Sequence, residues 1–387
     1  MTPKEKESLP ISVEKQYREI GEIIMKDICR RIKKAGEITS TADWQINRLV
    51  MMGATTEEIE REIKKRLNIS YQEVFKLYDK VIDWEYVRNK DIYEQVNSRF
   101  VPYEENRELQ QLTKAIIAQT NEELKNISQS LGYAIKMNGK VVFTPLSEYY
   151  QKYVDTACIE VATGAVDYNT AIRKTVKQMS DSGMRYGGVN YPSGYSTLID
   201  VAARRAIMTG VSHLSNYIAQ DNAKKLGTDY FEVEWHAGAR PTHQAWQGKV
   251  YSSSELVTIC GLGTGEGLNG WNCYHTYYPF IPGISERNWT DEELEQKNQE
   301  ENSPHEWGGR EYTYYELSQK QRQMERDMRA QREYIQGLKY GNTDKADIIN
   351  AQAKYKGQIR NYKNFCGKFD MPNQAQRVYY DMRGRQA

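Results

Sequence analysis

The stretch "WHAGARPTHQAWQGKVY", residues 235–251, brings together two of the chain's five histidines, two tryptophans and a Gly-Ala-Arg-Pro turn. Gly238 can adopt a positive φ without steric cost, and Pro241 fixes its own φ while biasing Arg240 away from the helical region. The guanidinium of Arg240 offers several N–H donors for loop carbonyls or a carboxylate. This stretch therefore predicts a tight turn that holds a small folded unit together.

The residues that follow this turn predict a short helix and a strand. Thr242 is a favoured N-cap, so we expect a helix over 242–247 that ends at Gly248, a residue type common at the C′ position. A short strand is expected at 249–252. Upstream, residues 229–236 alternate polar and apolar side chains, which is typical of a half-buried strand.

Residues 225–285 are therefore predicted to form a small α+β module. Glycines recur through "GLGTGEGLNGWNC", residues 261–273, which predicts a flexible loop, and prolines exclude a helix from 277–285. A module of this size has little core of its own. We expect Trp246 and Trp271 to supply most of that core.

Residues 12–222 carry the pattern of a mainly helical region. Isoleucines recur at helical spacing near its start, and Thr55 with Glu58 forms a capping-box pattern that predicts the start of a helix. "MNGKVVFTP" predicts a short hairpin at 137–144. Further helices are expected near 70–98, 104–130, 146–181 and 195–224.

Charged residues are unevenly distributed along the chain. The net charge is only +1, so the protein as a whole has no electrostatic field that would draw it to DNA or anionic lipid. Residues 286–306 carry eight acidic residues against two basic ones, and Thr290 with Glu293 forms another capping box. An acidic run of this kind is typical of a solvated helix face or a flexible linker.

Residues 320–385 have the opposite sign, with fifteen lysines and arginines against seven acidic residues. They predict a long basic helix followed by positive charges interleaved with aromatic rings. Such groups can hold phosphates and stack bases, so this tail is a candidate for contact with double-stranded DNA. The alternative is a charged helix that packs on acidic neighbours such as 286–306. The DNA-contact candidates are Lys320, Arg322, Arg326, Arg329, Arg332, Lys354, Lys356, Arg360 and Lys363.

Five side chains of the module could in principle bind a metal ion: those of His236, His243, Cys260, Cys273 and His275. Structural zinc sites normally show a tight ligand pair such as CxxC, whereas here only Cys273 and His275 are close, at a separation of two residues. Two residues at that separation on an extended segment can point to one side. The spacing nevertheless favours side chains that hydrogen-bond the loop backbone, so we expect no metal ion and no other cofactor.

No arrangement of residues predicts catalysis. Cys273 with His243 or His275, oriented by Asn272, could mimic a Cys/His/Asn site, but no helix N-terminus is predicted beside this cysteine to activate it. The glycine-rich loop lacks the Lys-Ser/Thr pair of a phosphate-binding loop. The five scattered cysteines indicate a reduced, intracellular protein. We therefore expect no enzyme, and keep as an alternative a zinc-binding or enzymatic module centred on His243, Cys273 and His275.

Several motifs occur in an order that resembles the phage minor capsid protein 2 family, which is similar to the F-type minor head proteins of tailed phages. The quoted motifs are "VNYPSGYSTLIDVAARRAIMTGVSH" (189–213), "GARPTHQAWQGKVYS" (238–252), "GLNGWNCYHTYYPFIPGISE" (267–286) and "YTYYELSQKQRQMERDMRAQ" (312–331). The residues expected to form the structural motif are Gly238, Arg240, Pro241, His243, Trp246, Gly248, Trp271, Asn272, Cys273 and His275. The CxxC of some relatives is absent.

The resemblance implies a structural protein of the virion, in the head interior or at the portal vertex, assembled in the bacterial cytoplasm. The implied partners are the portal protein, the major capsid or a scaffolding protein, and packaged double-stranded DNA, with several copies per virion and no membrane. We expect an α+β protein with an extended, mainly helical N-terminal region, a small α+β module and a long helical tail. The expected divisions are a portal-docking region at 1–224, the module at 225–285, an acidic linker at 286–319 and the basic tail at 320–387.

Overall fold

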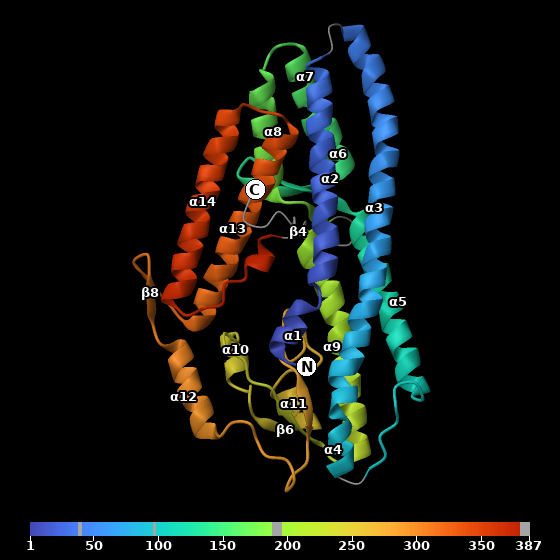
Figure 1. Ribbon diagram of the computed structural model, residues 1–387, viewed down its shortest axis with the longest axis vertical. Helices are drawn as coiled ribbons and strands as arrows, with labels where there is room; N and C mark the ends of the chain where they lie inside the picture. The colour runs from blue at the N-terminus through green and yellow to red at the C-terminus, as the bar shows by residue number, and fades with distance from the viewer. Residues whose placement is uncertain (38–40, 96–97, 188–195, 380–387) are drawn as a thin grey trace. The chain divides into compact units, whose positions relative to one another are not determined.

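The computed structural model describes residues 1–37, 41–95, 98–187 and 196–379, which form two compact units (Figure 1). Each unit is built from segments far apart in the sequence. Unit 1 comprises Met1–Ser12, Tyr71–Glu123 and Arg204–Lys320. Unit 2 comprises Val13–Ser70, Leu124–Ala203 and Gln321–Ala387. The predicted mainly helical α+β class is confirmed.

The N-terminal half is mostly helical, as predicted. Its helices are α1 (Pro3–Ser8), α2 (Ile11–Ala35), α3 (Thr41–Glu85), η1 (Val87–Asn89), α4 (Lys90–Gln95), α5 (Arg107–Gln129), α6 (Leu146–Tyr149), the π-helical η2 (Tyr150–Val154), α7 (Asp155–Ala162), α8 (Tyr168–Ser182) and α9 (Ile199–Leu226). The start predicted by the capping box at Thr55 is wrong, because α3 runs without interruption from Thr41 to Glu85. Residues 189–195 of the first motif lie outside the described residues.

Unit 2 contains a four-stranded antiparallel sheet with strand order β2-β1-β3-β4. Its strands are β1 (Leu131–Met137), β2 (Lys140–Pro145), β3 (Arg185–Gly187) and β4 (Ser196–Leu198). The predicted hairpin is confirmed and is longer than expected, with Met137 paired to Lys140. Its turn residues Asn138 and Gly139 both have positive φ, as a two-residue type I′ turn requires.

The C-terminal tail is helical, as predicted. Helix α13 (Tyr314–Tyr340) leads to α14 (Lys345–Lys368) and to the short η3 (Ala375–Arg377). Tyr362 of α14 is buried and donates a hydrogen bond to the buried Glu325 of α13 at 2.8 Å. Burial raises the pKa of Glu325. One face of α14 thus packs on α13 within unit 2.

Unit 1 contains the predicted module, built on a three-stranded antiparallel sheet with β5 in the middle of the order β6-β5-β7. Its elements are β5 (Tyr230–Val233), α10 (Pro241–Gln244), β6 (Val250–Ser252), α11 (Ser253–Thr258) and β7 (Tyr277–Phe280). Phe231 and Val233 on β5 are fully buried, as the alternating pattern predicts. They share a core with Trp246, Leu256 and other apolar residues. Burial of each such side chain contributes about 1.5–3 kcal/mol.

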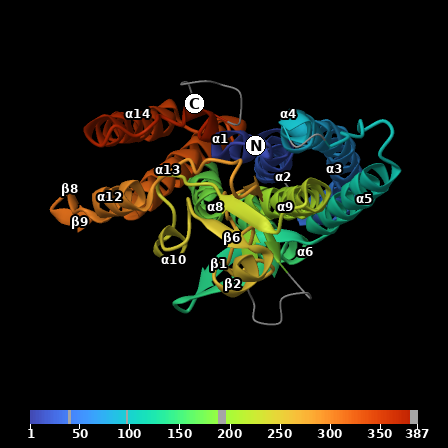
Figure 2. The same ribbon diagram turned by 90° about the horizontal axis from the view of Figure 1, so that it is seen from below.

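The acidic stretch 286–319 belongs to unit 1 and contains regular structure. Thr290 and Glu293 form the predicted capping box at the start of α12 (Asp291–Asn302). Strands β8 (His305–Trp307) and β9 (Arg310–Tyr312) then form a hairpin at the end of α12 that lies away from β6 (Figures 1 and 2). Most of α12 is exposed, which agrees with a solvated acidic helix face.

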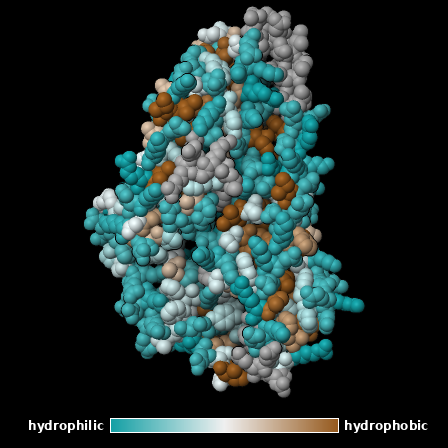
Figure 3. All heavy atoms as spheres, in the orientation of Figure 1, coloured by the Kyte–Doolittle hydropathy of each residue, from teal (hydrophilic) through white to brown (hydrophobic). Residues whose placement is uncertain are grey.

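The molecular surface drawn in Figure 3 is mostly hydrophilic, with hydrophobic residues scattered over it. Among the described residues, we find no helix with both the length and the apolar character needed to span a bilayer.

Candidate functional site

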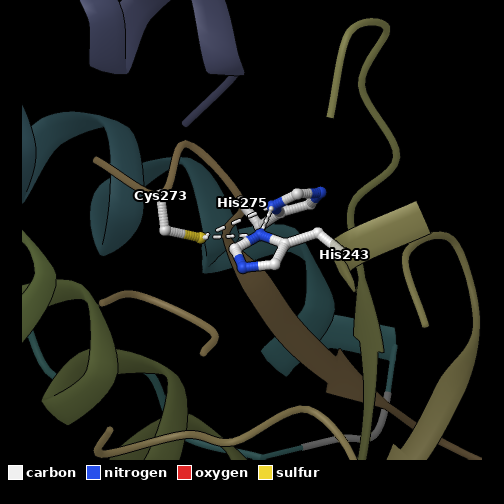
Figure 4. Close-up of side chains that lie close together, drawn as sticks. All are labelled: His243, Cys273 and His275. Atoms are coloured by element: carbon white, nitrogen blue, oxygen red, sulfur yellow. Dashed lines mark hydrogen bonds between the residues drawn. The ribbon is translucent and has the colours of Figure 1, made fainter. Parts of the chain in front are cut away.

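The side chains of His243, Cys273 and His275 point toward one another in unit 1 (Figure 4). His243 Nδ1 lies 3.4 Å from His275 Nδ1, and Cys273 Sγ lies 3.4 Å from His275 Nδ1 and 3.9 Å from His243 Nδ1. The exposed fractions of the three residues are 2%, 3% and 1%, respectively. The structure thus brings together three of the five residues considered as metal ligands, and we call them the His/Cys cluster.

Two glycines shape the segment that carries His243. Gly238 has φ 71° and Gly248 has φ 75°, which confirms the conformations predicted for both. A Cβ on Gly248 would lie 2.5 Å from Leu294 Cδ2, so a larger residue there would require the Leu294 side chain to move. These two glycines set the backbone conformation before and after α10, the helix that carries His243.

The helix of this segment begins one residue earlier than predicted. Arg240 rather than Thr242 is the N-cap residue, and Pro241 occupies the first helical position, where its missing N–H costs nothing. The helix also ends at Gln244, before the expected 247. The guanidinium of Arg240 donates to the carbonyl oxygen of Trp271 at 2.7 Å, as the sequence predicts for a loop carbonyl. This bond ties the turn to the segment that carries the other two cluster residues.

The glycine-rich loop, which the sequence predicts to be flexible, has a compact backbone. A Cβ on Gly267 would lie 2.1 Å from the carbonyl oxygen of Gly261, and a Cβ on Gly270 would lie 2.4 Å from that of Gly265. The glycines are there because the loop backbone packs against itself. In this path the loop presents the carbonyl oxygen of Glu266 to His243 Nε2 at 2.8 Å.

The outer nitrogens of the two cluster imidazoles both face hydrogen-bond acceptors. His243 Nε2 faces the Glu266 carbonyl, and His275 Nε2 lies 2.9 Å from Gln247 Oε1. The orientation of the Gln247 amide follows from the backbone N–H of His236, which can only donate and lies 3.2 Å from the same Oε1. Both Nε2 atoms are therefore the donors, and each neutral imidazole presents an unprotonated Nδ1 to the cluster.

Both imidazoles are neutral near pH 7. Burial lowers the pKa of His243 to about 4, and the positive charge of Arg240 adds to this effect. Burial also lowers the pKa of His275 well below its usual value, and neighbouring histidines act in the same direction. Neutral imidazole is the form that binds metal ions.

A buried lysine from the start of the chain also reaches this region. Lys6 Nζ donates to Asn269 Oδ1 and to the carbonyl oxygen of His275, both at 2.8 Å. Burial lowers the pKa of Lys6, and its interaction with Cys273 is the largest effect that opposes this shift. Lys6 therefore ties the start of the chain to the segment that carries Cys273 and His275.

The other two predicted candidates are not among the three residues whose ligand atoms converge. His236 stacks on His275, with ring centroids 4.1 Å apart, and its Nδ1 lies 3.0 Å from the carbonyl oxygen of Ala237. Cys260 belongs to the apolar core, where burial raises the pKa of its thiol to about 12. Sequence reasoning missed Gln247 and Lys6. Gln247 follows His243 by four residues, whereas no local pattern links Lys6 to residues so distant in the chain.

The two tryptophans expected to form the core behave differently. Trp246 is 5% exposed, and its ring centroid lies 4.5 Å from that of His243 and 4.8 Å from that of His275. Trp271 is 67% exposed, so its predicted place in the core is wrong. Its ring lies against Gly265, where an added Cβ would come within 2.8 Å of it. Asn272 is exposed and has φ 54°, which turns the chain so that the next residue points inward.

The DNA-contact candidates divide into exposed and enclosed residues. Lys354, Lys356, Arg360 and Lys363 are exposed on α14. Arg332 is 2% exposed and donates to Tyr355 Oη at 2.8 Å, so it is wrong as a surface contact. Arg329 is half-buried and donates to the carbonyl oxygen of Arg377 at 3.0 Å. On α13, Arg326 is exposed and Lys320 and Arg322 are half-buried.

The described residues form a mainly helical α+β protein with a buried His/Cys cluster and a basic helix. Comparison with known proteins identifies its family. The family model for phage minor capsid protein 2 matches residues 1–366, and the chain belongs to this family. A protein of Lactococcus phage LL-H described as "Structural protein" is 24% identical over 344 residues, which cover 83% of this chain and 85% of that protein. No solved structure matches. The chain therefore has a structural role in a phage capsid.

Proposed function

We propose that this protein is a minor head protein at the portal vertex of a tailed phage, where it supports head assembly and the packaging and ejection of the genome. The family match over residues 1–366 and the similarity to a phage structural protein support this role. The family match and the description of that relative as a structural protein also favour a protein that is not an enzyme. Several copies per virion, formed in the bacterial cytoplasm, are part of the proposal.

An apolar edge strand in the predicted docking region 1–224 carries the proposed contact with the portal protein. Strand β2 lies at one edge of its sheet. Val141 and Val142 on it are 68% and 45% exposed, and Met137 across the hairpin is 47% exposed. An exposed apolar edge strand is a template for pairing with another chain. We infer that the portal protein covers it, with the major capsid or a scaffolding protein as a further partner elsewhere.

Substitution of Val141 tests this contact with the full chain, because deletion of N-terminal segments would remove parts of both units. We expect Val141→Lys to weaken capture by immobilised portal protein by roughly tenfold or more, since a charge on an edge strand opposes pairing. Val257→Lys is the matched control: Val257 is 55% exposed on α11, and its substitution should leave capture unchanged. Equal capture of the parent and the Val141→Lys protein would rule out this docking surface.

Contact of α14 with packaged double-stranded DNA is the second candidate function. Between Ile348 and Phe369 the chain carries five lysines and arginines and no acidic residue. Lys356, Arg360 and Lys363 are exposed and follow the i, i+4, i+7 spacing that places side chains on one helix face. An exposed row of positive charges on a helix segment that itself carries no acidic residue suits the phosphate backbone.

The salt dependence of DNA binding tests this second function. Replacement of Lys356, Arg360 and Lys363 by glutamine should reduce the slope of log K against log salt by about 2.7, because each phosphate contact contributes about 0.9. The control replaces Arg61, Lys64 and Lys65, which are exposed on α3 among glutamates, and should leave the slope unchanged. An unchanged slope in the α14 variant, or no binding at low salt, would exclude DNA contact by α14.

A further inference from the structure

We propose that His243 Nδ1, Cys273 Sγ and His275 Nδ1 bind one Zn²⁺ ion, which fastens the small module of unit 1. This inference revises the expectation of no metal and is independent of the contact with the portal protein. It stands on the separations of the three ligand atoms, on the hydrogen bonds that orient the two imidazoles, and on the chemistry of the donor set.

The three ligand atoms have the spacing that a tetrahedral zinc ion requires. With Zn–N of about 2.05 Å and Zn–S of about 2.3 Å, two nitrogens of a tetrahedral site lie about 3.4 Å apart, and nitrogen and sulfur lie about 3.6 Å apart. The observed separations are 3.4 Å between the two Nδ1 atoms, and 3.4 Å and 3.9 Å from sulfur to nitrogen. A shift of a few tenths of an ångström therefore suffices to bind the ion.

The hydrogen bonds of the two imidazoles favour a cation between their Nδ1 atoms. Both Nε2 atoms donate to acceptors, so both Nδ1 atoms carry lone pairs and face each other at 3.4 Å. The thiol of Cys273 has one proton, which can satisfy only one of the two. The second lone pair would remain buried and opposed to the first, which is costly. A single metal ion satisfies both nitrogens and the sulfur at once.

The hydrogen bonds on the far side of each imidazole resemble those of metal sites. Histidine ligands commonly donate their outer N–H to a carbonyl or another acceptor, which fixes the ring and the tautomer. Here the carbonyl of Glu266 and the amide oxygen of Gln247 accept these protons. The acceptors come from the compact glycine loop and from the turn after α10, so the fold positions both rings before an ion binds.

The donor set selects the ion. Two imidazole nitrogens and one thiolate suit a borderline-soft ion such as Zn²⁺, whereas Mg²⁺ and Ca²⁺ prefer oxygen.

The ion would connect the α10 turn to the segment that leads into β7. His243 lies on α10, while Cys273 and His275 precede β7. The small apolar core of the module lies next to this junction, since Trp246 packs on both histidines. Metal binding in such a place is coupled to folding, because the unfolded chain has no preformed site. The role of the ion is therefore to stabilise the module.

Elemental analysis of the full chain, produced without a histidine tag in zinc-containing medium, tests the site. We expect about one zinc per chain. Replacement of zinc by Co²⁺ should give the near-ultraviolet band of a cobalt–thiolate bond. Protein that contains no zinc and gives no such band with added Co²⁺ would overturn the proposal. A stoichiometric metal other than zinc would overturn the choice of ion.

Variants identify the ligands. We expect Cys273→Ser to lose the cobalt–thiolate band and His243→Ala to lose most of the bound zinc. Cys260→Ser is the matched control, because this cysteine is also buried in unit 1 but lies outside the cluster, and it should keep both signals. If a variant fails to fold, the zinc content and the cobalt spectrum of the parent protein still decide whether the site binds metal. Full zinc content together with an unchanged cobalt spectrum in Cys273→Ser would refute cysteine ligation. Portal capture enters none of these measurements, so either proposal can fail alone.

Discussion

A chelator that removes the proposed Zn²⁺ is expected to lower the melting temperature of the isolated protein by about 10 °C. An ion that binds only the folded state stabilises it by RT ln(1 + [L]/Kd), which is about 4 kcal/mol when free zinc exceeds Kd by about a thousandfold. For a unit of this size, each kcal/mol corresponds to roughly 2–4 °C. Thermal unfolding followed by circular dichroism, with and without chelator, measures the difference.

The direction of this effect follows from the cluster itself. Without the ion, two Nδ1 lone pairs and one thiol remain enclosed at separations of 3.4–3.9 Å. Addition of excess zinc should restore the original melting temperature, because the compact loop and the turn still position the ligands. Cys260→Ser should keep its sensitivity to the chelator, whereas Cys273→Ser should lose it. Zinc-loaded protein that melts at the same temperature in chelator would contradict a stabilising role for the ion.

The module could be predicted from the sequence because its signals are local. The alternation along 229–236 requires only the period of a strand, and Gly238 and Gly248 require only the steric freedom of glycine. Both glycines have the positive φ that was expected. The hairpin at 137–144 likewise follows from Asn-Gly between two apolar runs.

Where local signals mislead, a competing interaction explains the difference. Thr55 and Glu58 have capping-box spacing, but neither residue type interrupts a helix as glycine or proline does, and α3 continues through them. Thr242 is a favoured N-cap, yet Pro241 before it takes the first helical position. Alternate glycines indicate conformational freedom of the backbone. In this loop they allow close backbone contacts such as that of Gly267 with Gly261.

The sequence favoured no metal site and gave His243, Cys273 and His275 only as an alternative, because their approach depends on contacts between distant parts of the chain. His243 and Cys273 are 30 residues apart, and Lys6 bonds to His275 across 269 residues. A search for tightly spaced ligand pairs misses a site of this kind, since only Cys273 and His275 are neighbours. The better sequence signal is a histidine fixed by a glycine-bounded turn, together with a second Cys-x-His pair on an extended segment.

Substitution of the two tryptophans of the module by alanine should change the free energy of unfolding by very different amounts. Trp246→Ala is expected to lower the free energy of unfolding by about 3–5 kcal/mol, since its ring is 5% exposed and packs on His243 and His275. Trp271→Ala should change it by only about 0.5 kcal/mol, because its ring is 67% exposed.

Urea unfolding of both variants in the presence of chelator separates packing from metal binding, since Trp246 touches two proposed ligands and Trp271 touches none of their rings in the described contacts. The difference between the two variants should persist without the ion, because it arises from the loss of buried apolar surface at one position and of exposed surface at the other. A Trp246→Ala protein as stable as Trp271→Ala under these conditions would contradict the contribution of the buried Trp246 ring to the stability of the module. The opposite order would mean that the exposed ring over Gly265 holds the glycine loop in place.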